Sequence, residues 1–524
     1  MSRIADYLVG KISPSRLDPM GLGQLTWQYW RSMMRKPGAV MAQNIALATE
    51  QAGLLAYAMK RSIGMEAAEV VKPPSGDRRF KDPAWTEQLL FDLIKQSYLL
   101  TSRYVTNLAG AAELERRQQR KLDFLTRQFV DALSPGNFVL SNPEVLRATI
   151  DSKGANLVQG MKNLARDLAA GNGQLRIRMV DESQFEVGKN IATTPGKVVF
   201  ENDLMQLIQY TPSTDQVYQA PLVIFPPWIN TFYILDLAPH NSFIRWAVSK
   251  GYTVFIVSWV NPDAKLAHKT FEDYLNEGIF EALDAIEAAT GEREVNAIGY
   301  CIGGTLLACA LSQMAQTGDD RIRSTTFFTT QVDFSEAGDL TVFTDEYQIK
   351  SLERTMRKRG YLDASEMATT FNMLRANDLI WSFVINNYLL GKSPAAFDLL
   401  YWNNDSTRMP VAMHSYYLRE MYLENRLAEP GGITLNGLPV DLGQVRIPIF
   451  LQSSKEDHIA PYPSVYKATK LYSGPVTFML AGSGHIAGVI NPPQANKYYY
   501  YSNSEVPSDV EDWIESADYH EGSW

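Results

Sequence analysis

The pattern of hydrophobic and polar positions changes near residue 190, and the stretch before that point has a helical period. Apolar residues recur on one side of an expected helix at Leu114, Leu122, Leu125, Phe129 and Leu133. This three-to-four spacing is typical of an amphipathic helix. Charged residues of both signs fill the intervening positions, so we interpret that side as a solvated face and not as a binding patch. We expect a mainly helical N-terminal domain over residues 1–190.

From about Lys197 onward, short runs rich in β-branched and aromatic residues alternate with helix-like segments such as Phe271 to Thr290. The alternation predicts a mostly parallel sheet covered on both sides by helices, with reactive groups at the C-terminal ends of its strands. The expected strands are Val198–Glu201, Met205–Tyr210, Leu222–Phe225, Thr253–Trp259, Val295–Tyr300, Thr325–Thr330, Ile447–Leu451 and Val476–Leu480. Residues 191–524 are therefore predicted to form an α/β catalytic domain.

This strand rhythm stops between about residues 334 and 446. The interval contains aromatic-rich segments such as Leu379 to Tyr388 and Met413 to Tyr422. An insertion of this size within a sheet protein is most simply a cap domain that covers the active site. We therefore expect a cap insertion over about residues 334–446.

One of the two cysteines lies at an expected strand-to-helix turn, in the run Gly299-Tyr300-Cys301-Ile302-Gly303-Gly304. The pattern is that of a nucleophile elbow, in which small flanking residues let a strained turn push the central side chain above the sheet. The turn also places the backbone N–H of Ile302 at a helix N-terminus, where it can donate to an oxyanion. The alternative is a buried cysteine in a tightly packed turn.

A carboxylate and an imidazole follow later strands, where the acid and the base of a catalytic triad are expected. Asp457 follows the strand that ends near Leu451, and His485 follows the strand that ends near Leu480. The order nucleophile, acid, histidine is the one expected of α/β-hydrolases. We predict a catalytic triad of Cys301, Asp457 and His485, in which the imidazole accepts the thiol proton and the carboxylate fixes its tautomer.

Other residues near the expected site have competing interpretations. Asp457 can instead cap a helix, and Glu456 and His458 compete with it for the role of acid; we place His458 in a supporting role. The N–H of Ile229, after the first central strand, is the candidate for the second oxyanion donor. Cys309, on the helix after the elbow, is interpreted as a core thiol in preference to a second catalytic sulfur.

Composition narrows the class of protein. The chain has 524 residues and a net charge of -9, which argues against nucleic-acid binding. Two cysteines cannot form a disulfide framework, which fits a reducing cytoplasm. The six histidines lack metal-ligand spacing, so we expect neither a metal nor another cofactor. No apolar run approaches the roughly 20 residues of a transmembrane segment.

The sequence resembles the polyhydroxyalkanoate synthases, and in particular the class I enzymes. The resemblance runs through most of the chain and is carried by motifs such as Ser134-Pro135-Gly136-Asn137-Phe138, Asn377-Asp378-Leu379-Ile380-Trp381 and Gly484-His485-Ile486-Ala487-Gly488-Val489-Ile490-Asn491-Pro492-Pro493. It implies the same triad and points to Asp236 and Trp402 as pocket or support positions. The implied fold is an α/β-hydrolase fold with an inserted cap, preceded by the helical domain.

The resemblance also implies the activity and its partners. Such an enzyme polymerises (R)-3-hydroxyacyl-CoA, here of short chain length such as 3-hydroxybutyryl-CoA, into polyester through an acyl-cysteine and releases CoA. It implies a cytoplasmic homodimer at the surface of polyester granules, where granule-associated proteins can join it, with the N-terminal domain serving dimerisation or granule attachment. The alternative is a Cys-dependent thioesterase or esterase, because fold and triad do not choose between water and a hydroxyl as acceptor.

Overall fold

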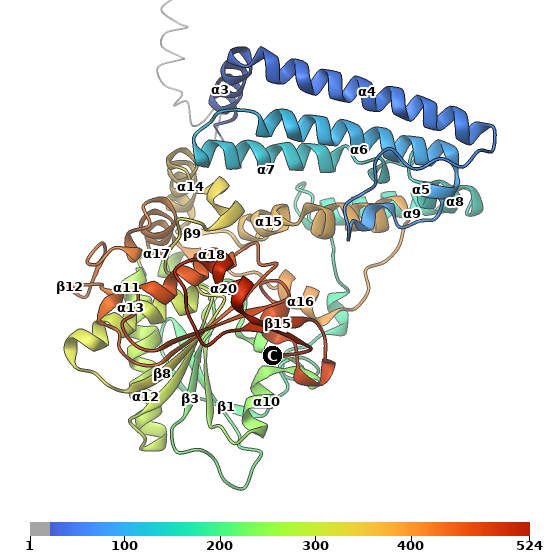
Figure 1. The fold of residues 1–524 in the computed structure, drawn as a ribbon. Helices are drawn as coiled ribbons and strands as arrows, with labels where there is room; N and C mark the ends of the chain where they lie inside the picture. Colours follow the sequence, from blue (N-terminus) through green and yellow to red (C-terminus); the bar gives the residue numbers. More distant parts are fainter. Residues whose placement is uncertain (1–20) are drawn as a thin grey trace, which may run out of the picture. The chain divides into compact units, whose positions relative to one another are not determined.

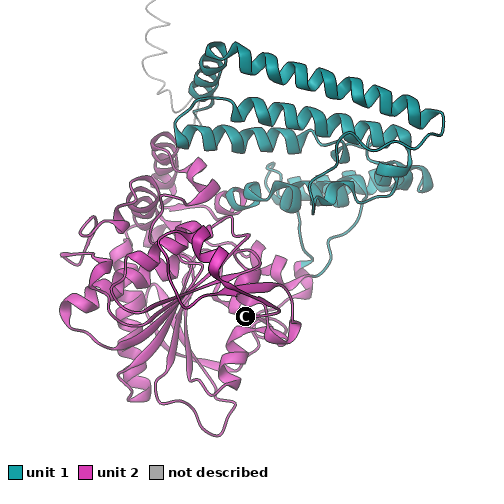
Figure 2. Ribbon diagram, viewed as in Figure 1, with its two compact units in different colours: residues 1–181, 370–396 teal, residues 182–369, 397–524 magenta. Residues whose placement is uncertain are grey.

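In a computed structural model of the protein, residues 21–524 are described (Figure 1). The chain divides into two compact units that are interleaved in sequence (Figure 2). Among the described residues, one unit comprises residues 21–181 and 370–396, and the other comprises residues 182–369 and 397–524. Residues 370–396 of the expected cap region thus belong to the same unit as the N-terminal helices.

The first unit is built from helices, in keeping with the helical period of its sequence. Its main helices are α3 (Leu22–Arg35), α4 (Pro37–Ser62), α6 (Leu89–Gly110), α7 (Arg116–Ala132), α8 (Pro143–Asp151) and α9 (Ala155–Ala170), with a short α5 (Ala84–Glu87). Helices α4, α6 and α7 lie side by side in a row, with α4 at its edge (Figure 2).

The face predicted for α7 is wrong in part. Phe124 is 1% exposed and Lys121 is buried beside it, whereas Phe129 and Leu133 are 58% and 52% exposed. The buried face of α7 is therefore rotated away from the expected apolar stripe, and it includes the side chain of Lys121. The long apolar part of a lysine side chain makes such burial tolerable.

Buried polar groups tie α4 to α6. The Tyr57 hydroxyl on α4 donates to Oδ2 of Asp92 on α6 at 2.5 Å. The Lys95 ammonium contacts Oδ1 of Asp92 at 3.1 Å and Oε1 of Glu69 at 2.6 Å. Asp92 and Lys95 are almost fully buried, so this pairing compensates for their removal from water.

The returning segment 370–396 completes the first unit by packing on α9. Its π-helical turns are η8 (Asn377–Trp381) and η9 (Val384–Leu389). The Tyr388 hydroxyl donates to Asp167 at 2.6 Å, and the Asn163 amide donates to the Asn387 carbonyl at 2.9 Å. A Cβ on Gly160 would lie 1.8 Å from the Tyr388 carbonyl oxygen, so only glycine permits this close approach.

The second unit contains a ten-stranded sheet in the order β1-β2-β6-β3-β7-β8-β13-β14-β15-β16. Its strands from β6 to β14 are parallel, and antiparallel strands flank them on both sides. The strands are β1 (Gly196–Glu201), β2 (Met205–Tyr210), β3 (Leu222–Phe225), β6 (Val254–Trp259), β7 (Val295–Tyr300), β8 (Ile322–Phe328), β13 (Ile449–Ser454), β14 (Val476–Ala481), β15 (Tyr499–Ser502) and β16 (Asp518–Glu521). This is the predicted doubly wound sheet, extended at one edge by two strands that the sequence did not reveal.

Helices cover both faces of this sheet. Phe243 of α10 (Phe243–Ser249) packs on Phe328 of β8, with ring centres 5.5 Å apart. Trp513 of α20 (Val510–Ser516) packs on Phe478 of β14 at 4.8 Å. The register of β8, β13 and β14 puts Phe328 and Phe478 on opposite faces, so these helices cover opposite sides. Helices α12 (Glu281–Thr290), α13 (Ile302–Thr317) and α18 (Tyr462–Lys467) also contact strands of the sheet, whereas the short α11 (Phe271–Asp273) packs on α17 (Val411–Tyr416) of the inserted region.

The chain between β8 and β13 carries the inserted helices. Those assigned as α-helical are α14 (Glu346–Arg359), α15 (Ala364–Leu374), α16 (Asp398–Asn404) and α17 (Val411–Tyr416), and α17 continues into the π-helical η10 (Tyr417–Leu423). Short two-residue ladders join β9 (Tyr361–Leu362) to β10 (Met409–Pro410) and β11 (Thr434–Leu435) to β12 (Leu438–Pro439). A further ladder joins β4 (Asp236–Ala238) to β5 (Asn241–Ser242). No helix among residues 21–524 combines the length and apolar character that crossing a bilayer requires.

Candidate active site

Cys301 lies on the turn between β7 and α13, where the sequence predicts an elbow. Its backbone has φ 53° and ψ −126°, a conformation that L-residues rarely adopt. The Cys301 N–H donates to the Phe328 carbonyl at 2.9 Å, and the Cys301 carbonyl accepts from the N–H groups of Gly304 and Thr305 at 3.0 and 3.1 Å. The neighbouring strand and the first turn of the helix thus hold the strained residue in place.

The glycines of the motif are required by the space around them. A Cβ on Gly299 would lie 2.5 Å from the Gly304 Cα, where strand and helix touch. A Cβ on Gly303 would lie 2.3 Å from the Phe225 carbonyl oxygen and 2.5 Å from that of Pro226. The first turn of α13 therefore packs directly against the end of β3.

This packing brings the loop after β3 beside the elbow. The loop carries Ile229, and Ile302 is the first residue of α13, where a backbone N–H has no acceptor within the helix. The Thr407 side chain fixes the loop, because its hydroxyl donates to the Trp228 carbonyl at 2.7 Å and accepts from the Asn230 N–H at 2.9 Å. Ile229 lies between these two anchored residues.

The Asp457 carboxylate uses its oxygens for different purposes. Oδ1 accepts from the N–H groups of Ile459 and Ala460, both at 2.8 Å, and Oδ2 lies 2.7 Å from Nδ1 of His485. The sequence allows two roles for Asp457, capping and pairing with a histidine. In the structure its carboxylate makes both kinds of contact. The turn it caps keeps the second oxygen aimed at the imidazole.

His485 lies after β14 with its ring buried beside Cys301. Burial alone lowers the pKa of this histidine, but the Asp457 carboxylate and the Cys301 sulfur more than offset that effect and raise it to about 10. Nδ1 is bonded to Asp457, so Nε2 is the nitrogen available to the Cys301 thiol, with which the imidazole shares a hydrogen bond. The structure thus brings the three predicted triad residues together.

Comparison with known proteins identifies the family. The model of the poly-beta-hydroxybutyrate polymerase N-terminus matches residues 76–247, and that of the alpha/beta hydrolase fold matches residues 221–492. The chain is 51% identical to the Poly(3-hydroxyalkanoate) polymerase subunit PhaC of Rhizobium meliloti (strain 1021), over all of this chain and 88% of that protein. It is 51% identical to the Poly(3-hydroxyalkanoate) polymerase of Methylorubrum extorquens, over 94% of this chain and 81% of that one. The chain belongs to the poly(3-hydroxyalkanoate) polymerase family.

A more distant relative also aligns along almost the whole chain. The Poly(3-hydroxyalkanoate) polymerase subunit PhaC of Cupriavidus necator is 38% identical over 98% of this chain and 91% of its own. The predicted family and α/β-hydrolase fold are therefore confirmed, and the chain is an enzyme of the acyltransferase type. The hydrolase match spans Cys301, Asp457 and His485.

Asp236 and Trp402, the support positions implied by the resemblance, bond to residues around the predicted triad and not to the triad itself. Asp236 is buried, and its Oδ1 accepts from the hydroxyls of Thr194 at 2.6 Å and Ser242 at 2.5 Å. Burial raises its pKa, and these hydrogen bonds oppose the rise. Trp402 donates from Nε1 to the Thr231 carbonyl at 2.8 Å, and its own carbonyl accepts from the Asn230 amide at 3.1 Å. Trp402 thereby braces the loop that carries Ile229.

His458 and Cys309 lie outside the triad. His458 is half-buried next to Asp457, and it is the Asp457 carboxylate that accepts the hydrogen bond from Nδ1 of His485. Cys309 is fully buried in α13, and burial raises its pKa to about 12. A thiol held in its protonated form within the core suits packing better than nucleophilic attack.

Sequence reasoning missed two tyrosines next to the elbow. Tyr417 and Tyr422 belong to η10 and are each 6% exposed, with their rings 5.5 Å apart. Burial raises the pKa of both phenols, and the nearby Cys301 sulfur raises both further. The aromatic content of the inserted segment was visible in the sequence, but nothing in it marked these two rings as neighbours of Cys301.

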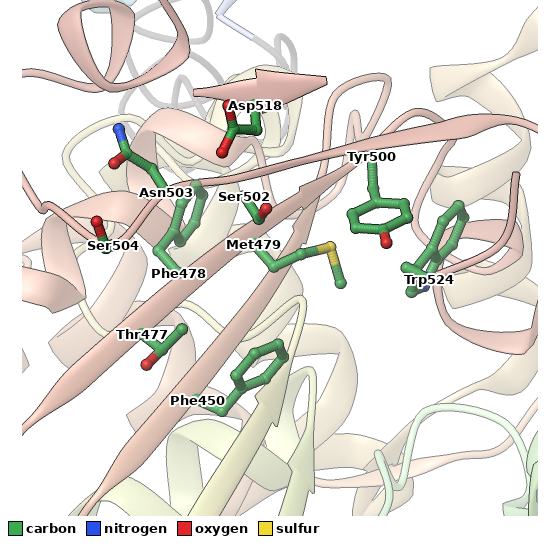
Figure 3. A pocket seen from close by; sticks show the side chains of 10 residues that line it. All are labelled: Phe450, Thr477, Phe478, Met479, Tyr500, Ser502, Asn503, Ser504, Asp518 and Trp524. Atoms are coloured by element: carbon green, nitrogen blue, oxygen red, sulfur yellow. The ribbon is translucent and has the colours of Figure 1, made fainter. Parts of the chain in front are cut away.

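A surface hollow in the second unit is separate from this site (Figure 3). It has a volume of about 440 Å³, and it lies on the sheet extension around β13 to β16. Aromatic and methionine side chains line it together with hydroxyl, amide and carboxylate groups: Phe450, Thr477, Phe478, Met479, Tyr500, Ser502, Asn503, Ser504, Asp518 and Trp524. Within residues 21–524, no cluster of three or more His, Cys, Asp or Glu side chains is suited to hold a metal ion.

Proposed function

We propose that the protein polymerises (R)-3-hydroxyacyl-CoA into a polyester and releases CoA, with Cys301 as the acyl carrier. Two facts support the proposal: membership of the poly(3-hydroxyalkanoate) polymerase family, and a thiol on a strained turn beside an imidazole–carboxylate pair. The observation that carries the chemistry is the buried contact of His485 with both Asp457 and Cys301.

In the loading step, the proton of the Cys301 thiol passes to Nε2 of His485 and the sulfur attacks the thioester carbon. The bond from that carbon to the CoA sulfur breaks, and the departing sulfur takes the proton from the imidazolium. One thioester is exchanged for another, so this step is nearly balanced in free energy. The N–H groups of Ile302 and Ile229 are the proposed donors to the oxygen that becomes negative.

In the elongation step, His485 removes the proton from the 3-hydroxyl of a monomer or chain end. The alkoxide attacks the acyl carbon on Cys301, the carbon–sulfur bond breaks, and the sulfur recovers a proton from His485. A thioester is converted into an oxoester, which supplies the downhill direction. Asp457 holds the ring in orientation and stabilises its charge throughout.

Water competes with the hydroxyl for the acyl-enzyme, so the site has to exclude it. His485 is 6% exposed, and the buried phenols Tyr417 and Tyr422 lie near the sulfur. We propose that this aromatic wall, with Trp402 behind the loop at Ile229, favours transfer to an alcohol. A preference for short-chain monomers, a homodimeric state and a place at the granule surface with its associated proteins belong to the same proposal.

The test compares the products formed from (R)-3-hydroxybutyryl-CoA and a medium-chain analogue. We expect CoA release together with insoluble polyester from the short-chain substrate, and an acyl adduct on residue 301 in mass spectra of the trapped enzyme. The Cys301→Ala variant should give neither. Release of CoA with only free 3-hydroxy acid would show a thioesterase instead, and CoA release by Cys301→Ala at the normal rate would remove the thiol from the mechanism.

A further inference from the structure

One arginine of the π-helical segment η10 is held by carboxylates of another helix. Nε and Nη2 of Arg419 donate to Oε1 and Oε2 of Glu353 on α14, at 2.7 and 3.0 Å. Nη1 donates to Oε2 of Glu346, at the start of the same helix, at 3.1 Å. Two parallel N–H···O bonds fix the orientation of both groups as a single contact does not. We call the pair of Glu353 and Arg419 the fork.

The carboxylate side of the fork belongs to a well-fixed helix. Helix α14 buries Ile349 and Met356 completely, and it lies beside α17 (Figure 1). At its C-terminal end, the Gly360 carbonyl accepts from the N–H of Val411, the first residue of α17, at 3.1 Å. Glu353 is only 7% exposed, so its charge depends on the guanidinium for compensation. Helix α14 and its C-cap thus hold the segment formed by α17 and η10 at two points, its first residue and the fork.

The aromatic wall lies on the other side of η10. Tyr417 precedes Arg419 by two residues, so their side chains leave the helix on opposite sides. The Tyr417 ring packs 5.5 Å from that of Tyr422 and 6.0 Å from that of Phe334. The Cys301 sulfur raises the pKa of both phenols, as a group close to them would. The fork therefore holds η10 from behind, while the wall faces the site.

The wall also depends on the π-helical winding of η10. In an α-helix, residues five apart lie about 140° apart around the axis. In η10 the Glu424 N–H donates to the Arg419 carbonyl, five residues back, at 3.0 Å, which is the hydrogen bond of a π-turn. This wider turn brings the rings of Tyr417 and Tyr422, also five residues apart, into contact. Such turns are rare, and the fork joins α14 to the residue at which this one closes.

We propose that Glu353 and Arg419 are positioning residues that hold the aromatic wall beside Cys301 and thereby direct the acyl group to a hydroxyl instead of water. The inference rests on the proposed function, because it concerns the fate of the acyl group on Cys301. It assigns the choice of acceptor to two side chains that bond to each other and not to the triad.

The competing reaction explains why the position of the wall matters. Water adds to the acyl carbon while His485 takes its proton, the bond from that carbon to the Cys301 sulfur breaks, and the sulfur receives the proton. A free 3-hydroxy acid leaves. Water is small and needs no prepared site, whereas the 3-hydroxyl of a monomer or chain end has to be placed. A loosened wall therefore admits water and misplaces the alcohol, so hydrolysis gains on polymerisation.

The test measures how much of the CoA released from (R)-3-hydroxybutyryl-CoA is matched by free 3-hydroxybutyrate and how much by polyester. Arg419→Lys keeps the charge but cannot form two parallel bonds, and Glu353→Gln keeps the shape but loses the charge. We expect each variant to raise the free-acid share at least about fivefold, while the rate of first acylation of Cys301 stays within about twofold. A variant that is merely less stable loses acylation and polymer together and keeps the ratio of products, which would refute the proposal.

Arg426→Lys is the matched control. Arg426 makes one contact with Glu420 of η10, at 3.0 Å, and is half exposed. The same substitution there should leave the free-acid share unchanged. The double variant of Arg419→Lys with Glu353→Gln should resemble the more severe single variant, because one fork can be broken only once. Effects that multiply in the double variant would contradict the fork as their common cause.

Hydrogen exchange tests the same idea without substrate. We expect peptides from residues 417–425 to exchange several times faster in both fork variants than in wild type, and peptides from β7 and β8 to be unchanged. If a variant unfolds, β7 and β8 exchange faster too, and Glu353→Asp, which keeps the charge but shortens its reach, takes its place. Unchanged exchange of η10 in the folded variants would contradict the proposal.

The outcomes distinguish this inference from the proposed function. If wild type releases CoA and forms only free acid, the proposed polymerisation is wrong and the inference falls with it. If wild type forms polyester and the fork variants keep its ratio of free acid to polyester, the inference is wrong while the proposed function stands.

Discussion

Asp457 and His485 show how single residues set the chemistry of the site. Strand position points to the loop that carries Glu456, Asp457 and His458, and the family resemblance points to Asp457 within it; that choice stays a prediction until catalysis is measured. The sequence could not show which partner each oxygen of the Asp457 carboxylate has. Oδ1 accepts from two backbone N–H groups, and Oδ2 accepts from the imidazole of His485. That detail depends on a turn geometry with no distinct sequence pattern.

Replacement of the carboxylate should expose this role. In Asp457→Asn, the amide keeps the size of the side chain but loses the charge that raises the pKa of His485. We expect CoA release from the acyl-CoA substrate to fall by about 10² to 10⁴-fold, with little loss of substrate binding. The measurement is initial-rate kinetics of CoA release from pH 6 to 10. Glu456→Gln serves as the neighbouring control, and equal losses in both variants would contradict the assignment.

The raised pKa of His485 also predicts how stability depends on pH. The folded value of about 10 lies above the ordinary value of 6.5, so the folded state binds the proton more tightly than the unfolded state. The resulting stabilisation is complete below about pH 6.5 and is lost as pH rises toward 10. Melting temperatures of wild type and His485→Gln should therefore converge over this range. A difference that stays constant with pH would argue against the buried ion pair.

At the scale of elements, the elbow depends on how closely α13 approaches β3. Gly303→Ala would set a methyl group 2.3 Å from the Phe225 carbonyl oxygen, and backbone cannot yield as a side chain can. We expect a loss of about 1–3 kcal/mol in the free energy of unfolding, together with a large loss of activity as the elbow shifts. Denaturant titration measures the first and CoA release the second.

The matched control for that substitution is Gly110→Ala at the end of α6. Nothing lies within 4 Å of the Cβ position at Gly110, so alanine should be neutral or slightly stabilising there. If both substitutions lowered the free energy of unfolding equally, the clash at Gly303 would add no cost beyond that of replacing a helical glycine, and the prediction would be wrong.

The loop at Ile229 offers a test of positioning by hydrogen bonds. Thr407→Val removes the hydroxyl that joins the Trp228 carbonyl to the Asn230 N–H while keeping the branched shape. We expect kcat to fall about tenfold or more with KM nearly unchanged, because the proposed oxyanion donor loses its fixed position. Thr407→Ser retains the hydroxyl and should restore most of the rate. If serine and valine behave alike, the hydroxyl does not position the loop.

The strands show where sequence patterns succeed and where they fail. The eight expected strands correspond to β1, β2, β3, β6, β7, β8, β13 and β14, with ends displaced by up to three residues. Apart from the mostly exposed β1, each is an apolar or alternating run that the sheet buries at least in part. Strands β15 and β16 were missed because neither contains an aliphatic residue, and three of the four residues of β16 are polar or charged. Their pairing comes from tertiary contact with β14, which local sequence cannot report.

At the scale of the whole molecule, the interleaving of the two units along the chain is the feature that the sequence predicts least. A continuous cap over residues 334–446 was the simplest expectation, yet residues 370–396 pack on α9 in the first unit. The contacts that decide this join residues more than 200 positions apart, such as Asn163 and Asn387. No periodicity in either segment points to the other.

A substitution on α9 in the full-length chain should reveal whether segment 370–396 depends on Gly160 for its packing. Gly160→Val forces a side chain into the space of the Tyr388 backbone, so we expect segment 370–396 to detach from α9. Limited proteolysis should then cut within this segment several times faster than in wild type, as mass spectrometry of early fragments would show. Ala165→Val, at an exposed position of the same helix, is the control for helix propensity. Unchanged cleavage of Gly160→Val would contradict the role of the glycine.

The split of the first unit also sets an order of events during synthesis. Its N-terminal helices leave the ribosome early, but the piece that lies on Gly160 and Asn163 follows about 200 residues behind residue 181. At 5–20 residues per second, this is a wait of roughly 10–40 s. During that time the nascent chain presents an unfinished α9 surface to the cell, so chaperones have a defined period in which to guard it. The domain that is begun first can be completed only after much of its neighbour has been made.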